Sequence, residues 1–195
     1  MRGTAREALV LGGRGELSHI LTERLGKLGH RVTYLQADDA PQDLTTDLLV
    51  QLDTTLADSD SREPVEPEHA LSRARAAFEV LQRAAASMKD RGFGRIVHVR
   101  SVPAPGPGSS LTGPMSAFAS AGTLGMLQDL ARQVARFGVT LNIVTLTPVP
   151  PGRDSLPPLQ RQATVTEVAG LVEMLCHDEA GFMTAQSLSL VSAAS

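Results

Sequence analysis

The sequence has little of several features that mark particular classes of protein. It contains a single cysteine, Cys176, which excludes a disulfide framework and favours a reducing, cytoplasmic environment. No apolar run approaches the ~18 residues that a membrane span requires, and the first residues do not have the pattern of a signal peptide. The net charge of −3 argues against nucleic acid as a partner.

The five histidines do not form a metal-binding pattern. They stand at positions 19, 30, 69, 98 and 177, and they share no ligand spacing with one another or with Cys176. We therefore expect no metal site. His98 lies inside an expected strand, where we interpret it as a structural histidine with a hydrogen-bond partner.

The 195 residues do contain a regular alternation of short apolar runs and amphipathic stretches, which predicts alternating strands and helices. We expect strands at 7–11, 31–36, 47–52, 95–101, 139–146 and 186–191. We expect helices at 19–28, 66–91, 115–137 and 164–177. This order is typical of one α/β domain, residues 1–195, in which helices cover both faces of a parallel sheet.

Residues 94–148 contain the most specific motif. They read GRIVHVRS, a loop rich in proline and glycine, MSAFASAGTLGMLQDLARQVARFG, and VTLNIVTLTP. This run resembles the short-chain dehydrogenase/reductase family, in which GRIVNISS, a Tyr-x-x-x-Lys helix and ITVNAVAPG follow one another. The resemblance implies a Rossmann-like, doubly wound parallel sheet of about six strands. It also implies a sheet truncated at one edge, because only residues 37–46 replace the family's third strand and its two flanking helices.

The family's catalytic groups are missing from the matching positions. In the family, a tyrosine gives its proton to the substrate carbonyl, and a lysine lowers the pKa of that tyrosine. Counted back from Gly138 without a gap, these two positions hold Ser116 and Ser120, whose hydroxyls cannot take over the proton transfer. The asparagine of the family's proton relay corresponds to Arg73, and only Ser101 matches the family's substrate-orienting serine. We therefore expect no catalytic residues.

The nucleotide-binding turn has changed as well. Of the three glycines in the family's TGxxxGxG pattern, only Gly12 remains here, and Glu16 and Ser18 replace the second and third. Gly13 and Gly15 fall on variable positions of the pattern, so the turn is degenerate. A carboxylate ~4 Å from a phosphate repels it by about 4 kcal/mol at an effective dielectric of ~20, roughly a thousandfold in affinity. We expect this chain to bind no cofactor and a partner subunit to bind NADP. The alternative is that Arg14, in the same turn, restores phosphate binding.

The two central helices are expected to form an interface. No charged residue occurs from 112 to 128, so helix 115–137 is apolar on all sides and needs cover beyond its own sheet. In the family, the helices matching 66–91 and 115–137 form the main contact between subunits. The residues expected at such an interface are Phe78, Leu81, Phe118, Leu124, Met126 and Leu127. A helix buried deeply within a monomer is the alternative.

The loss of these groups favours a protein that acts through a partner. The pattern is similar to the non-catalytic subunits of aminocoumarin antibiotic biosynthesis, of the novobiocin biosynthesis protein K type. The resemblance implies a catalytically inactive subunit in a heteromer with an active, NADP-dependent homologue. That homologue would act on a β-hydroxy or β-keto acyl or aminoacyl group tethered to a carrier protein, with β-hydroxytyrosyl oxidation as the specific expectation. A cofactor-independent cyclase or aldolase in the vacated cleft, or a ligand-sensing protein, are the alternatives.

Overall fold

A computed structural model describes residues 4–53, 67–102, 114–148 and 161–192. Within these ranges, six strands form one parallel sheet in the order β2-β1-β3-β4-β5-β6. The strands are β1 (Glu7–Leu11), β2 (Arg31–Leu35), β3 (Leu48–Leu52), β4 (Gly94–Ser101), β5 (Val139–Pro148) and β6 (Ser187–Ser192). The helices are α1 (Glu16–Lys27), α2 (Pro67–Arg91), α3 (Pro114–Ala135) and α4 (Val165–Cys176).

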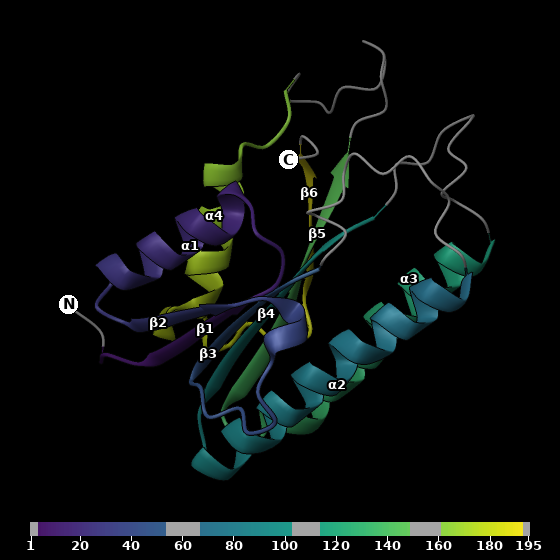
Figure 1. Ribbon diagram of the computed structural model, residues 1–195. Coiled ribbons are helices and arrows are strands. Elements are labelled where there is room, and N and C mark those ends of the chain that lie inside the picture. The colour runs from purple at the N-terminus through teal and green to yellow at the C-terminus, as the bar shows by residue number, and fades with distance from the viewer. Residues whose placement is uncertain (1–3, 54–66, 103–113, 149–160, 193–195) are drawn as a thin grey trace.

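The helices cover both faces of the sheet, as a doubly wound fold requires (Figure 1). Helices α1 and α4 pack together on one face, and α2 and α3 pack together on the other. Each face has its own apolar cluster, one beneath each helix pair. The central strands β3 and β4 are buried on both sides, which explains the nearly continuous apolar run of β3. Strand β4 is also buried but contains polar residues.

The fold class predicted from the sequence is confirmed, and the observed strand bounds differ from the predicted ones by at most two residues. Helix α1, by contrast, begins at Glu16, three residues before the predicted start at His19. The reason is local, because the hydroxyl of Ser18 bonds to the backbone of Gly15 and caps the helix at that point. The helix ends at Lys27, one residue before the predicted end, and Gly29 just beyond it has a φ of 94°, as a glycine that closes a helix often does.

The short connection from β2 to β3 replaces a longer crossover. Strand β2 is an edge strand, and residues 36–47 lead from it across β1 to β3. The connection contains one 3₁₀ turn, Ala37–Asp39, and Leu44 is buried in the cluster beneath α2 and α3. Arg83 of α2 donates to the carbonyl of Pro41 at 3.3 Å. The connection therefore runs over the same face of the sheet as α2.

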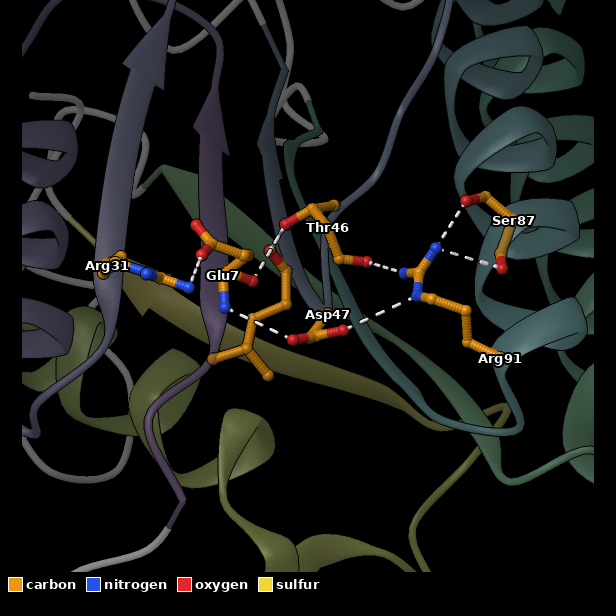
Figure 2. Close-up of polar contacts among 7 residues, drawn as sticks. Glu7, Arg31, Thr46, Asp47, Ser87 and Arg91 are labelled. Atoms are coloured by element: carbon orange, nitrogen blue, oxygen red, sulfur yellow. Dashed lines mark hydrogen bonds and ion pairs between the residues drawn. The ribbon is translucent and has the colours of Figure 1, made fainter.

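A polar network fixes the end of this connection at the amino ends of the strands (Figure 2). The side chain of Asp47 accepts a hydrogen bond from the Glu7 amide at 3.3 Å and lies 3.7 Å from Arg91 Nε. Thr46 donates through its hydroxyl to the Glu7 carbonyl at 3.0 Å, and its own carbonyl accepts from Arg91. These contacts join β1, β3 and the last turn of α2. Because open α/β sheets bind ligands at the opposite, carboxyl edge, we interpret this network as structural.

None of the described helices is long and apolar enough to cross a membrane. The loop rich in proline and glycine that is expected after GRIVHVRS lies almost wholly outside the described residues.

Candidate functional site

The turn between β1 and α1 is held by contacts within the chain. Gly12 has a φ of 145°, and a Cβ added there would lie 2.7 Å from the Leu52 Cβ and closer still to the Leu52 carbonyl oxygen. The hydroxyl of Tyr34 donates to the Gly12 carbonyl at 3.0 Å. The packing of β1 against β3 therefore requires glycine at this position, whatever the turn binds.

The amino end of α1 is occupied by its own side chains. The buried Ser18 hydroxyl accepts from the Gly15 amide at 3.2 Å and donates to the Gly15 carbonyl at 2.8 Å. Glu16 lies in the first helical turn with its side chain exposed, and Gly13 is half-buried. The Glu16 carboxylate is favoured by the helix dipole and competes with any other anion there. This helix end therefore presents a carboxylate of its own.

Helix α3 contains Ser116 and Ser120, the two serines that the sequence count assigns to the positions of the family's catalytic pair. Ser116 lies in the first turn of the helix, and its side chain lies outside the described part of the chain. Ser120 follows one turn later, and Arg100 of β4 binds it in two places. Arg100 Nη1 donates to the Ser120 carbonyl at 2.9 Å, and Nη2 donates to the Ser120 hydroxyl. Ser101, the retained serine, is the half-buried last residue of β4.

Polar residues gather on one face of the sheet at the carboxyl ends of β3 and β4. Gln51 and His98 are register partners, and Arg100 lies two residues beyond His98 on the same face of β4. Asp53 follows β3, and its backbone amide donates to the Val99 carbonyl at 2.8 Å. Polar side chains are uncommon inside a parallel sheet covered on both faces. This cluster, here called the carboxyl-end cluster, therefore needs an explanation.

His98 is a neutral, hydrogen-bonded member of the carboxyl-end cluster. Its Nδ1 lies 3.1 Å from Gln51 Oε1, and Gln51 Nε2 donates to the Ala77 carbonyl at 3.4 Å. Because that amide oxygen can only accept, Nδ1 holds the proton. Burial lowers the pKa of His98 to about 4, with the Arg100 charge acting in the same direction and Asp53 opposing it. The predicted structural role of His98 is thus confirmed.

Arg100 is the buried cation of the carboxyl-end cluster, with 6% of its surface exposed. Burial lowers the pKa of its guanidinium, and the nearby charge of Asp53 partly offsets that effect. Asp53 in turn lies 3.4 Å from Arg73 of α2, the residue at the position of the family's asparagine. The cluster therefore contains two arginines beside one carboxylate.

This arrangement provides charge without a pair of groups for proton transfer. A serine acts as a nucleophile when a general base lies within hydrogen-bond reach, but the Ser120 hydroxyl contacts an arginine, which is no base. His98 Nδ1 is occupied by Gln51. Within the described ranges, no three or more His, Cys, Asp or Glu side chains gather as metal ligands would.

The six residues expected at an interface divide into three groups. Phe118 and Met126 of α3 are exposed, at 64% and 40%. Phe78 and Leu124 are partly buried and pack against the core. Leu81 and Leu127 are completely buried within the chain's own core, so including them was wrong: they face the sheet and cannot meet a partner. The outer side of α3 is exposed in the chain alone, which contradicts the alternative of a helix buried on all sides.

Sequence reasoning missed three members of the carboxyl-end cluster: Gln51, Asp53 and Arg100. A signal was present for one of them, because GRIVHVRS places polar residues at alternate positions near the end of an otherwise apolar strand. Alternation of this kind puts the side chains of His98 and Arg100 on one face of the strand. The tertiary packing decides which helix covers these side chains. It also brings Ser120 within hydrogen-bond reach of Arg100.

Comparison with known proteins agrees with this fold. Residues 52–190 match the family described as enoyl-(acyl carrier protein) reductase. The chain is 33% identical over 120 residues to the 3-oxoacyl-[acyl-carrier-protein] reductase MabA of Mycobacterium avium, covering 55% of this chain and 46% of that protein. It is 32% identical over 123 residues to the acetoacetyl-CoA reductase of Allochromatium vinosum, covering 57% and 49%. The matches span about half the length of these curated relatives.

A solved structure extends the likeness over nearly the whole chain. The TT0495 protein of Thermus thermophilus is 24% identical and superposes with a TM-score of 0.74, covering 95% of this chain and 97% of that one. At this identity, the likeness concerns the fold. The family match spans more than half of the residues, and the curated relatives named above are reductases. The protein therefore belongs to the short-chain dehydrogenase/reductase family.

Proposed function

We propose that this chain is a non-catalytic short-chain dehydrogenase/reductase subunit that pairs with an active homologue. The observation on which the proposal depends is the Arg100–Ser120 contact. At the position of the family's lysine, the helix has a serine whose hydroxyl is bound to an arginine of β4. A serine in that contact has neither the charge nor the basicity to replace a Tyr-Lys pair.

The same proposal assigns the cofactor to the partner. The exposed Glu16 carboxylate and the buried, hydrogen-bonded Ser18 hydroxyl lie where a dinucleotide phosphate needs glycine and open backbone amides. These residues do not fit the group, so NADP binds only to the active homologue. Titration calorimetry of the isolated chain with NADPH tests this point, and micromolar binding would contradict it.

The contact surface is the exposed side of α3. It includes the side chains of Phe118 and Met126 and the exposed Gly122 and Gly125. A Cβ added at either glycine would meet no atom within 4 Å, so both lie open for the close approach of another helix. Exposed large apolar residues beside glycines on an uncharged stretch are typical of interaction sites.

The names of two relatives support the proposed substrate class. MabA is named as a 3-oxoacyl-[acyl-carrier-protein] reductase, and the Allochromatium protein as an acetoacetyl-CoA reductase. Both names describe β-keto acyl groups, one on an acyl carrier protein and the other on coenzyme A. We infer that the active partner oxidises or reduces a β-hydroxy or β-keto acyl or aminoacyl group on a carrier protein. Oxidation of β-hydroxytyrosyl groups in aminocoumarin antibiotic biosynthesis is the specific form of this proposal.

Co-expression with an active homologue tests the pairing. The two chains are expected to co-elute in size-exclusion chromatography, and Met126→Glu should weaken the complex roughly 100-fold by burying an unpaired charge. Met174→Glu is the matched control, since Met174 is exposed to a similar degree on α4, on the opposite face of the sheet. If the chains elute separately and the homologue alone is fully active, a cofactor-independent enzyme becomes the better proposal.

A further inference from the structure

The carboxyl-end cluster contains a buried cation, Arg100, whose hydrogen-bond acceptors among the described residues are uncharged. Among the described residues, no carboxylate oxygen forms an ion pair with Arg100 within 4.0 Å. Its described acceptors are both neutral, the carbonyl and the hydroxyl of Ser120. Buried charges are ordinarily paired, because removing a charge from water costs several kcal/mol, of the order of ~5. The nearby charge of Asp53 offsets part of this cost, and the remainder stays at this point.

The Arg100 guanidinium also has hydrogen-bond donors that the contacts with Ser120 do not use. An arginine side chain has five N–H groups in a planar fork, and the contacts with Ser120 engage one hydrogen on each of Nη1 and Nη2. The remaining N–H groups have no acceptor among the described residues. Such a fork matches the two oxygens of a carboxylate or a phosphate, which it can bind through parallel hydrogen bonds.

The position in the sheet is where ligands of open α/β folds bind. Arg100 is the second-to-last residue of the central strand β4, beside Ser101, and Asp53 follows the neighbouring strand β3. Ligands of such sheets lie outside the carboxyl ends of the strands. His98, which lies deeper on the same face, is neutral with its Nδ1 bound to Gln51 and contributes no charge. The carboxylate that could repel an anion is that of Asp53, which lies 3.4 Å from Arg73.

We propose that Arg100 is the anchor of a binding site for a small molecule bearing an oxyanion, a carboxylate or a phosphate, at the carboxyl ends of β3 and β4. The oxyanion accepts hydrogen bonds from the free part of the Arg100 fork while Ser120 holds the guanidinium in place. Arg73 and Asp53 form the neighbouring charged pair. This site is independent of the glycine turn and holds whether or not the chain pairs with a homologue.

Thermal unfolding of the full chain with added anions tests the site. Sodium phosphate and sodium malonate are titrated separately, with sodium chloride at matched ionic strength as the reference. We expect a saturable rise in melting temperature with one of the two anions at roughly millimolar concentration, as linkage requires for a ligand that binds the folded state. A response to phosphate alone identifies a phosphate ester as the ligand class, and a response to malonate alone identifies a carboxylic acid.

Two substitutions show whether the response belongs to Arg100. Arg100→Lys keeps the charge but removes the fork, and it should shift the midpoint of the titration at least tenfold upward. Arg75→Gln removes an exposed arginine of α2 that pairs with Glu79, and it should leave the midpoint unchanged. A second readout, the anion-induced shift of the Ser101 amide resonance, applies to the unmodified protein and does not depend on how the variants fold. No saturable response, or an equal response in Arg100→Lys, would overturn the proposal and leave Arg100 as a tie between β4 and α3.

Discussion

Replacing Gly12 by alanine tests why the glycine turn survives. If the turn is retained for the packing of β1 on β3, the substitution should damage the fold itself. A Cβ at this position would approach the Leu52 Cβ to 2.7 Å, with the Leu52 carbonyl oxygen closer still. Neither atom belongs to the far end of a flexible side chain, so the strands must shift to make room. The φ of 145° adds backbone strain for any residue with a side chain.

The cost of the close contact with Leu52 and the cost of the backbone strain at Gly12 can be added. Overpacking a well-filled interior costs about 1–3 kcal/mol, and a residue held in a sparsely populated backbone region costs about 1–3 kcal/mol. We therefore expect Gly12→Ala to lower the free energy of unfolding by about 2–6 kcal/mol. A domain is typically stable by about 5–15 kcal/mol, so the variant should be severely weakened. Urea unfolding followed by circular dichroism measures the change.

Gly15→Ala provides the matched control in the same turn. Gly15 has an extended φ of −171°, which any residue adopts, and a Cβ there would meet no atom within 4 Å. The Ser18 cap uses only the backbone of Gly15 and should persist, so the loss should stay near 1 kcal/mol, within the usual range for an N-cap change. If the two variants lose equal stability, contact with Leu52 is not the reason for glycine at position 12.

Three further outcomes are expected. Burial lowers the pKa of His98 to about 4, below its ordinary 6.5, so the unfolded state binds more protons between these pH values and stability should fall as the pH drops from 6.5 to 4. In urea unfolding at several pH values, His98→Gln should flatten this fall, and an unchanged slope would contradict the assignment. Ser116→Tyr combined with Ser120→Lys should not create a reductase, because Glu16 and Ser18 still obstruct the nucleotide turn; NADPH oxidation on a β-keto substrate would refute this. Burial raises the pKa of Cys176 to about 12, so its thiol should react with a disulfide reagent at pH 8 only after unfolding, and rapid reaction of the folded protein would be the opposite result.

The sequence by itself determined the order of strands and helices, because buried parallel strands and amphipathic helices have different apolar periods. It also indicated which residues of the family pattern are replaced. The replacement of two family glycines by Glu16 and Ser18, and the serines at 116 and 120, are facts of residue type that need no coordinates. The sequence showed that the connection at residues 37–46 is short. Its path over the face of the sheet that α2 covers became known only from the structure.

Only the tertiary structure decided what fills the place of the missing groups. Arg100 and Ser120 are twenty residues apart, and their contact depends on how α3 packs against β4. The structure also decided which side of α3 is exposed. A helix that is apolar on all sides has no polar face in its sequence, so the sequence does not indicate which side points to solvent. Leu127 turned toward the sheet, and Phe118 turned outward. Local periodicity fixes each element, but the pairing of faces is a property of the packed whole, and the candidate site belongs to that pairing.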